Sequence, residues 1–216
     1  MIYTRKYGVL PRNERECLRY AGTSPKDISP EERALLEACW KEAENKLTYQ
    51  VCWGRFPIKR KENGLDFGFL QTSSKALMKN LEDCGEVIVF AATVGLEIDR
   101  LIRRYTSLSP AKALFFQAIG AERIESLCDA FCADLQAEGL RLRPRFSPGY
   151  GDLPLELQRD IFRVLDCSRK IGLTLNESLL MSPSKSVTAI VGIGGKTEEG
   201  INTCSVCEKS DCAYRG

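Results

Sequence analysis

The chain contains no histidine, and this absence excludes several kinds of chemistry. Histidine is the usual general base of serine and cysteine hydrolases, and it is a common ligand in metal sites. A histidine-free chain therefore lacks a serine–histidine–aspartate triad and any metal site that depends on imidazole. Whatever reaction it supports must use other side chains or groups supplied by a cofactor.

Long apolar runs are absent as well. The longest apolar stretch, Val87 to Leu96, is ten residues long and is interrupted by Thr93 and Gly95, whereas a bilayer-spanning helix needs about 20 residues. No apolar segment of the signal-peptide kind follows Met1. We therefore expect a soluble, cytoplasmic protein that is neither secreted nor associated with a membrane.

An excess of one charge is also missing. The 31 Lys and Arg residues nearly balance the 29 Asp and Glu residues, which leaves a formal net charge of +2. So small a net charge offers no general attraction for nucleic acid or for an anionic membrane surface. Neither is expected as a partner.

The composition that remains is typical of a globular protein. Of the 216 residues, 44% are apolar and 28% are charged, and this length corresponds to about one domain. We expect residues 1–216 to form a single domain in which residues 203–216 are a cysteine-rich C-terminal tail. Four scattered cysteines are interpreted as reduced, small core residues: Cys39, Cys84, Cys128 and Cys132.

Helix caps and turn residues predict a mixture of helices and antiparallel strands. The segment Ser29-Pro30-Glu31-Glu32 is a capping box with proline at the first helical position, so a helix should run from residue 30 to about residue 46. The pair Asn63-Gly64, between two apolar segments, predicts a hairpin. Because helices and strands do not alternate regularly, an α+β fold is favoured over a doubly wound parallel sheet. The other expected helices cover about residues 14–20, 74–84, 96–105, 110–139 and 155–168, and buried strands are expected at residues 87–92 and 186–193.

The longest of these helices carries an acidic stripe. Glu122, Glu125 and Asp129 are spaced so that they share one face of the helix. Such a stripe is usually a solvated surface.

The loop Arg145-Phe146-Ser147-Pro148-Gly149-Tyr150 is the first candidate site. Its Pro-Gly pair predicts a tight turn in which glycine takes a positive φ and lets a ligand approach the backbone. Arg145 offers a planar fork suited to a carboxylate, and Tyr150 offers a ring face to a cation. A small zwitterion with a cationic centre would suit both residues, although an ordinary surface turn could have the same sequence.

A second candidate segment runs from Leu175 to Pro183 and leads through Ser184-Lys185-Ser186 into the last expected strand. It places Glu177, Met181 and several hydroxyl groups on a loop before a buried strand, a position where binding sites often lie. On its own, this pattern is more typical of structure than of function.

Taken together, the two segments resemble the activation domain of cobalamin-dependent methionine synthase. The resemblance rests on the order R-x-x-P-G-Y, a helix with Leu165-Asp166, then I-G-L-x-L-x-E-S-x-x-M-x-P and S-V. It covers Arg145 to about Ile193, is weaker over residues 118–135 and 16–20, and is greatest for the short, free-standing members of the family. The resemblance implies an α+β fold, built around a bent antiparallel sheet, that binds S-adenosylmethionine.

The function implied by the resemblance is reactivation of a protein-bound corrinoid. In the family, inactive cob(II)alamin returns to methylcobalamin with an electron from flavodoxin or a similar donor and a methyl group from S-adenosylmethionine. The chain would then act in trans on a separate methionine synthase, or on the corrinoid protein of another methyltransferase system. It would be a component of a cobalamin-dependent methyltransferase system.

The resemblance also implies roles for individual residues. Arg145 would hold the methionyl carboxylate, Ser147 and Gly149 would contact the ligand through backbone groups, and Tyr150 would lie beside the sulfonium as the catalytic residue. Matches to the family segment near the corrin face are Glu177, Met181 and Ser186. Apart from the resemblance, an acidic residue of the long helix, Glu125 or Asp129, would complement the sulfonium or the ribose.

Two features of the family have no counterpart in this sequence. There is no early Asp-Trp segment, and the aromatic residue that follows the last strand in the family is missing from residues 192–202. The alternative function is therefore a non-catalytic module that docks a corrinoid protein without binding the ligand.

The last residues include a cluster of thiols. Cys204, Cys207 and Cys212 have the spacing C-x2-C-x4-C, which can wrap zinc or an iron–sulfur cluster if a fourth ligand is available. Cys167, a second chain, solvent or an external ligand could supply it, and reduced thiols or an air-formed disulfide are the alternatives. A metal or redox sensor based on these cysteines is a third hypothesis.

Overall fold

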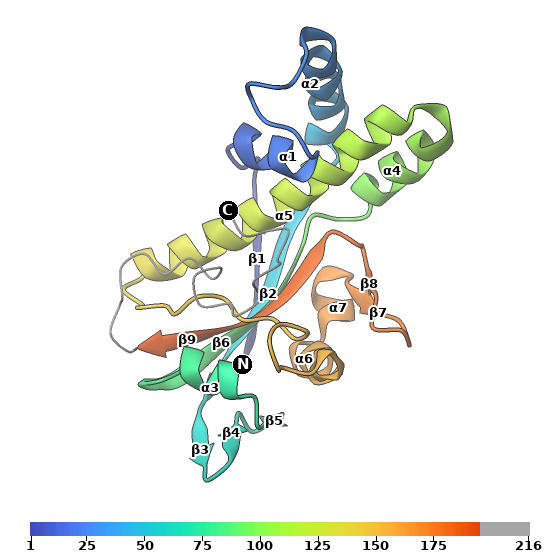
Figure 1. Ribbon diagram of the computed structural model, residues 1–216. Helices are drawn as coiled ribbons and strands as arrows, with labels where there is room; N and C mark the ends of the chain where they lie inside the picture. The colour runs from blue at the N-terminus through green and yellow to red at the C-terminus, as the bar shows by residue number, and fades with distance from the viewer. Residues whose placement is uncertain (195–216) are drawn as a thin grey trace.

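A four-stranded antiparallel sheet lies at the centre of the protein, described by a computed structural model over residues 1–194 (Figure 1). The strand order is β1-β2-β6-β9, and β6 pairs along its length with β2 on one side and β9 on the other. The strands of this sheet are β1 (Ile2–Tyr7), β2 (Tyr49–Pro57), β6 (Cys84–Thr93) and β9 (Ser186–Gly194).

The central strands are apolar on both faces, so helices cover both faces of the sheet. Ile88, Phe90 and Ala92 of β6 point to one core, and the alternate residues Val87 and Val89 point to the other. The first core lies under α1 (Glu14–Tyr20), α2 (Pro30–Glu44), α4 (Glu97–Leu108) and the long α5 (Pro110–Ala137). The second lies under α3 (Lys75–Asn80), α6 (Gln158–Leu165) and α7 (Cys167–Ile171).

Two small sheets and one short helix complete the described residues. One small sheet contains β3 (Lys59–Lys61), β4 (Gly64–Asp66) and β5 (Gln71–Thr72). The other pairs β7 (Thr174–Leu175) with β8 (Met181–Ser182), and the 3-10 helix η1 (Leu155–Leu157) precedes α6. In residues 1–194, no helix combines the length and the hydropathy needed to cross a membrane.

The α+β class and most of the expected elements are confirmed. Asn13 and Ser29 cap α1 and α2, and the Ser29 capping box with Glu32 is formed on both sides. The strand at Ser186 and the long helix that starts at Pro110 are also present. These elements agree with the sequence because their caps and apolar patterns are local signals.

Three expectations were wrong in detail. The Asn63-Gly64 turn joins β3 to β4, but the preceding apolar strand β2 pairs with β1 and β6 instead of folding back within the hairpin. The helix expected at residues 155–168 is divided, because Asp166 adopts a left-handed conformation (φ 53°) between α6 and α7. Helix α3 ends at Asn80, and the chain turns at Asp83 (φ 64°) before Gly85.

The acidic stripe on α5 is not wholly solvated, because Glu122 lies in the core. The side chains of Glu122 and Arg123 are 0% and 1% exposed and form an ion pair. The Arg123 guanidinium also donates to the carbonyl oxygens of Leu10 (2.7 Å) and Pro11 (2.6 Å). Glu122 accepts from the Asn13 backbone N–H (3.0 Å), so the pair attaches the segment before α1 to the middle of α5.

Replacing Arg123 by Met tests the importance of this pair. The change leaves the Glu122 carboxylate buried without its counter-charge, and we expect the free energy of unfolding to fall by about 3 kcal/mol. The double variant E122L/R123M should recover part of the loss, because no buried charge remains. Urea denaturation measures both.

The matched control is Arg163→Met, which breaks an ion pair with Asp160 on the surface, where Arg163 is 78% exposed. This control should change the free energy of unfolding by less than about 0.5 kcal/mol. Equal losses in R123M and R163M would contradict a special contribution from the buried pair.

Candidate functional site

The segment before the Pro-Gly turn runs along the outer edge of β9, and this contact positions Arg145. The backbone of Phe146 exchanges two hydrogen bonds with Ile190 (2.9 and 2.8 Å), and the Arg143 N–H donates to the Gly192 carbonyl (2.9 Å). Phe146 is buried in the core beneath α6 and α7. Since side chains alternate along an extended segment, Arg145 points to the opposite side, toward α5.

Arg145 forms ion pairs with two carboxylates of α5. Its Nη2 lies 2.8 Å from Oε2 of Glu125, and its Nη1 lies 2.6 Å from Oδ1 of Asp129. The two carboxylates are one helical turn apart, so both reach the same guanidinium. Burial raises the pKa of the Glu125 carboxyl, and the positive charge of Arg145 opposes that shift. Three of the residues singled out in the sequence are therefore brought together.

The turn itself has the geometry that its sequence predicts. The Tyr150 N–H donates to the Ser147 carbonyl (3.1 Å), and Gly149 has a φ of +86°, as the third residue of a type II turn requires. The rings of Tyr150 and Phe146 pack in an edge-to-face arrangement with their centroids 5.3 Å apart. Tyr150 is an exposed residue beside the turn.

Asp152 fixes the far end of the same loop. Its carboxylate accepts the backbone N–H groups of Lys75 (2.7 Å) and Ala76 (3.2 Å) and the hydroxyl of Ser74. These groups form the N-terminus of α3, so the loop is attached to β9 at Phe146 and to α3 at Asp152. The sequence analysis did not single out Asp152, because the contact joins residues about 77 positions apart.

The second candidate segment lies around the β7–β8 hairpin. The Glu177 carbonyl accepts a hydrogen bond from Arg159 (2.8 Å), Met181 packs against the core under α6 and α7, and the Ser186 hydroxyl lies 2.8 Å from Thr93 Oγ1. Ser186 is four residues along β9 from the partner of Phe146, a separation of roughly 13 Å. Glu177 and Met181 thus lie in the β7–β8 hairpin and Ser186 at the start of β9, apart from the Arg145 ion pairs.

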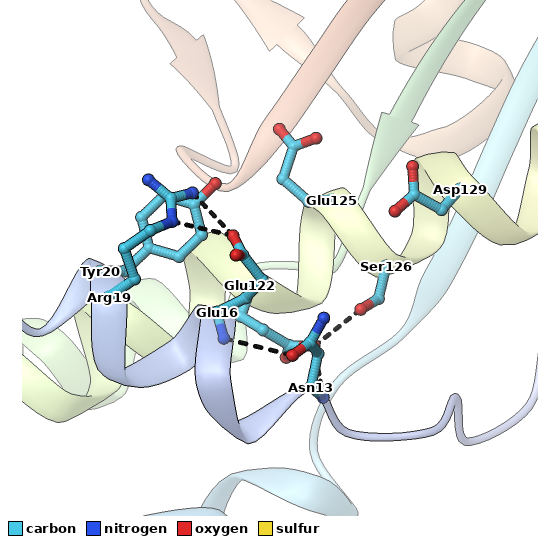
Figure 2. Close-up of a pocket in the computed structure, with 8 residues that line it drawn as sticks. All are labelled: Asn13, Glu16, Arg19, Tyr20, Glu122, Glu125, Ser126 and Asp129. Atoms are coloured by element: carbon cyan, nitrogen blue, oxygen red, sulfur yellow. Dashed lines mark hydrogen bonds and ion pairs between the residues drawn. The ribbon is translucent and has the colours of Figure 1, made fainter. Parts of the chain in front are cut away.

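A cavity of about 220 Å³ lies between α1 and α5 and includes the two carboxylates that bind Arg145 (Figure 2). From α1, Glu16 and Arg19 are joined by a hydrogen bond of 2.7 Å, and the Arg19 guanidinium lies 4.4 Å from the centre of the Tyr20 ring. Sequence reasoning proposed no role for these α1 residues; the available signal was the weak resemblance over residues 16–20. The residues lining the cavity are Asn13, Glu16, Arg19, Tyr20, Glu122, Glu125, Ser126 and Asp129.

The described cysteines are unpaired. Cys39, Cys84 and Cys128 are buried, as expected, whereas Cys132 is only partly buried. Cys167, considered above as a fourth metal ligand, is buried with its Sγ 3.9 Å from that of Cys52.

The proposed metal ligands Cys204, Cys207 and Cys212 lie outside the described residues, so that site stays a prediction. Within residues 1–194, no three Cys, Asp or Glu side chains are grouped so that they could hold a metal ion.

Comparison with known proteins identifies the fold. No protein-family model matches the chain, and no curated protein matches it in sequence. Among solved structures, the chain is similar to the crystal structure of the MetH reactivation domain bound to AdoHcy, S-adenosylhomocysteine. The alignment has a TM-score of 0.66 and 16% sequence identity, and it covers 93% of this chain and 80% of that one. The protein thus belongs to the α+β fold class, with an antiparallel sheet covered by helices. More specifically, the fold is that of the MetH reactivation domain, as the sequence resemblance predicts.

The cap at Asp152 predicts a pH-dependent stability. Hydrogen bonds from Ser74, Lys75 and Ala76 lower the pKa of the Asp152 carboxyl. The resulting stabilisation is complete above the unfolded-state pKa, about 3.9, and is lost as the pH falls through the lower folded-state value. We expect Asp152→Ala to reduce the free energy of unfolding by about 1 kcal/mol at pH 7, with the difference from wild type shrinking below about pH 4.

Urea denaturation between pH 7 and pH 3 measures this difference. Asp152→Asn is the control, because an amide oxygen can still accept the N–H bonds but does not titrate in this range. If the free energy of unfolding of wild type exceeded that of D152A by the same amount from pH 7 to pH 3, the carboxylate charge would not contribute to stability.

Proposed function

We propose that this protein binds S-adenosylmethionine at Arg145–Tyr150 and serves in the reductive reactivation of a corrinoid held by a separate protein. The observation that carries the proposal is the placement of Arg145, between two α5 carboxylates and next to the Pro148-Gly149 turn, in a chain with the fold of the MetH reactivation domain. The AdoHcy in that neighbouring structure supports the same class of ligand here.

The charges around the turn fit the amino-acid part of S-adenosylmethionine. The planar guanidinium of Arg145 suits a carboxylate, and the carboxylates of Glu125 and Asp129 suit an ammonium group or a ribose hydroxyl. Gly149 allows the positive φ of the turn, and in this proposal Ser147 and Gly149 contact the ligand through backbone groups. In this proposal the face of the Tyr150 ring lies beside the sulfonium, since the faces of aromatic rings attract cations.

The proposed reaction needs no general base, which agrees with the absence of histidine. When bound, S-adenosylmethionine supplies an activated methyl group, and the substrate is the cobalt of the partner's corrinoid after reduction by a flavodoxin-like or other electron donor. The residues of this chain hold and orient the ligand. Tyr150 lies beside the sulfonium in this proposal, and Glu177, Met181 and Ser186 face the corrinoid protein.

One observation favours a second function, a docking module that does not bind the ligand. Both terminal nitrogens of Arg145 already have carboxylate partners within the chain. Arg145 would then be a structural link between the loop and α5, and the protein would bind a corrinoid protein without taking part in methyl transfer.

Isothermal titration calorimetry with S-adenosylmethionine and S-adenosylhomocysteine distinguishes the two functions. We expect saturable binding by the wild-type chain and at least a tenfold loss of affinity in Arg145→Ala, because a charged hydrogen bond contributes roughly 1.5–3 kcal/mol. Arg145→Lys should lose affinity as well, since an ammonium keeps the charge but not the planar fork.

Arg163→Ala, which removes an exposed arginine of α6, is the control and should bind like wild type. Unchanged affinity in R145A would remove Arg145 from the site. A wild-type chain that binds a corrinoid protein but neither adenosyl compound would support the docking module instead.

A further inference from the structure

Both terminal nitrogens of the Arg145 guanidinium have carboxylate partners within the chain. Its Nη1 is bonded to Asp129 and its Nη2 to Glu125, at 2.6 and 2.8 Å. A carboxylate that binds an arginine side-on needs two neighbouring N–H groups pointing the same way. Each terminal nitrogen has two N–H groups, so a ligand carboxylate bound to Nη1 and Nη2 shares these nitrogens with the α5 carboxylates and is repelled by their charges. Its binding is therefore strongest when one of the α5 carboxylates moves away.

The two carboxylates are not equally easy to displace. The Asp129 side chain is 72% exposed, whereas that of Glu125 is 43% exposed. Asp129 is already largely hydrated, so releasing it to water requires little change in its surroundings. An exposed ion pair is also weak, typically worth 0.2–1 kcal/mol.

Glu125 is the better candidate to stay. It lines the cavity between α1 and α5 beside Tyr20, and its partial burial makes an unpaired charge there more costly than at Asp129. If Glu125 stays bonded to Nη2, the guanidinium plane keeps its orientation while Nη1 exchanges Asp129 for the ligand carboxylate. Glu125 would thus position Arg145, whereas Asp129 occupies the nitrogen, Nη1, that the ligand carboxylate would bind.

We infer that Asp129 is an internal competitor for the ligand's carboxylate on Arg145 and thereby sets the affinity of the site. This inference rests on the proposed function. Binding exchanges the Asp129 ion pair for a ligand ion pair, so only part of the strength of the new contact contributes to affinity. The same exchange favours release of the demethylated product, because Asp129 returns to Arg145 as the product leaves.

Replacing Asp129 by Asn removes the competing charge with little change in shape. We expect D129N to bind S-adenosylhomocysteine about 1.5- to fivefold more tightly than wild type, the range expected for removal of one exposed ion pair. S-adenosylhomocysteine is the suitable probe because it keeps the amino-acid carboxylate and has no sulfonium, so the amino-acid ammonium is its one remaining cationic group. Methylthioadenosine, which lacks the amino-acid carboxylate, should bind both proteins equally.

Glu138→Gln is the matched control. Glu138 immediately follows α5, is 52% exposed and pairs with an arginine, but that arginine is Arg5, away from Arg145. The control removes the same charge near the same helix and should leave both affinities unchanged. Circular dichroism checks that each variant is folded.

The outcomes separate this inference from the proposed function. If wild type binds S-adenosylhomocysteine and D129N binds it equally or more weakly, Asp129 supports Arg145 or plays no part, and the inference is wrong. If D129N tightens methylthioadenosine to the same extent, the effect does not involve the ligand carboxylate, and the inference is again wrong. If no variant binds S-adenosylhomocysteine, the proposed function itself fails.

Discussion

The position of α1 and of the segment before it against α5 depends on the buried ion pair of Glu122 and Arg123. Two neighbouring charges in the middle of α5 are desolvated, and they are compensated by each other and by backbone groups of residues 10–13. A pair of this kind tolerates few alternative positions, because any shift would leave a charge unsatisfied in the core. It therefore sets where α1 starts and how α1 lies against α5.

The candidate site follows from that constraint. Helix α1 provides Glu16, Arg19 and Tyr20 on one side of the cavity, and α5 provides Glu125 and Asp129 a turn or two after the buried pair. The same helix therefore has a structural acidic residue facing the core and two others directed at Arg145. The three carboxylates share one face of α5, and their positions along the helix distinguish them: residues 10–13 cover Glu122, whereas Glu125 and Asp129 lie further along, at Arg145. This explains why a stripe predicted to be solvated contains one fully buried member.

Much of the fold could be predicted from the sequence because its signals are local. The Ser29 capping box, the proline that begins α5 and the apolar run of β6 each specify an element from a few neighbouring residues. Strand pairing was harder to predict, because β1 has no fully buried residue and is recognisable only through its partner β2. The break at Asp166 depends on a left-handed residue that is not glycine. For the site, the Arg145–Tyr150 turn was predicted from its residues, whereas the Asp152 cap and the contacts of Arg145 require knowledge of which distant segments meet.

The two attachments of the loop, at Phe146 and at Asp152, have a thermodynamic consequence. A binding loop that is mobile in the free protein loses backbone entropy when it closes on a ligand, and that loss is subtracted from the affinity. Here contacts within the chain hold the backbone of the loop at both ends, so closing on a ligand would cost little further backbone entropy. Under the proposed function the loop would be preformed, and the binding enthalpy would reflect the exchange of ion pairs on Arg145 more than any folding of the loop.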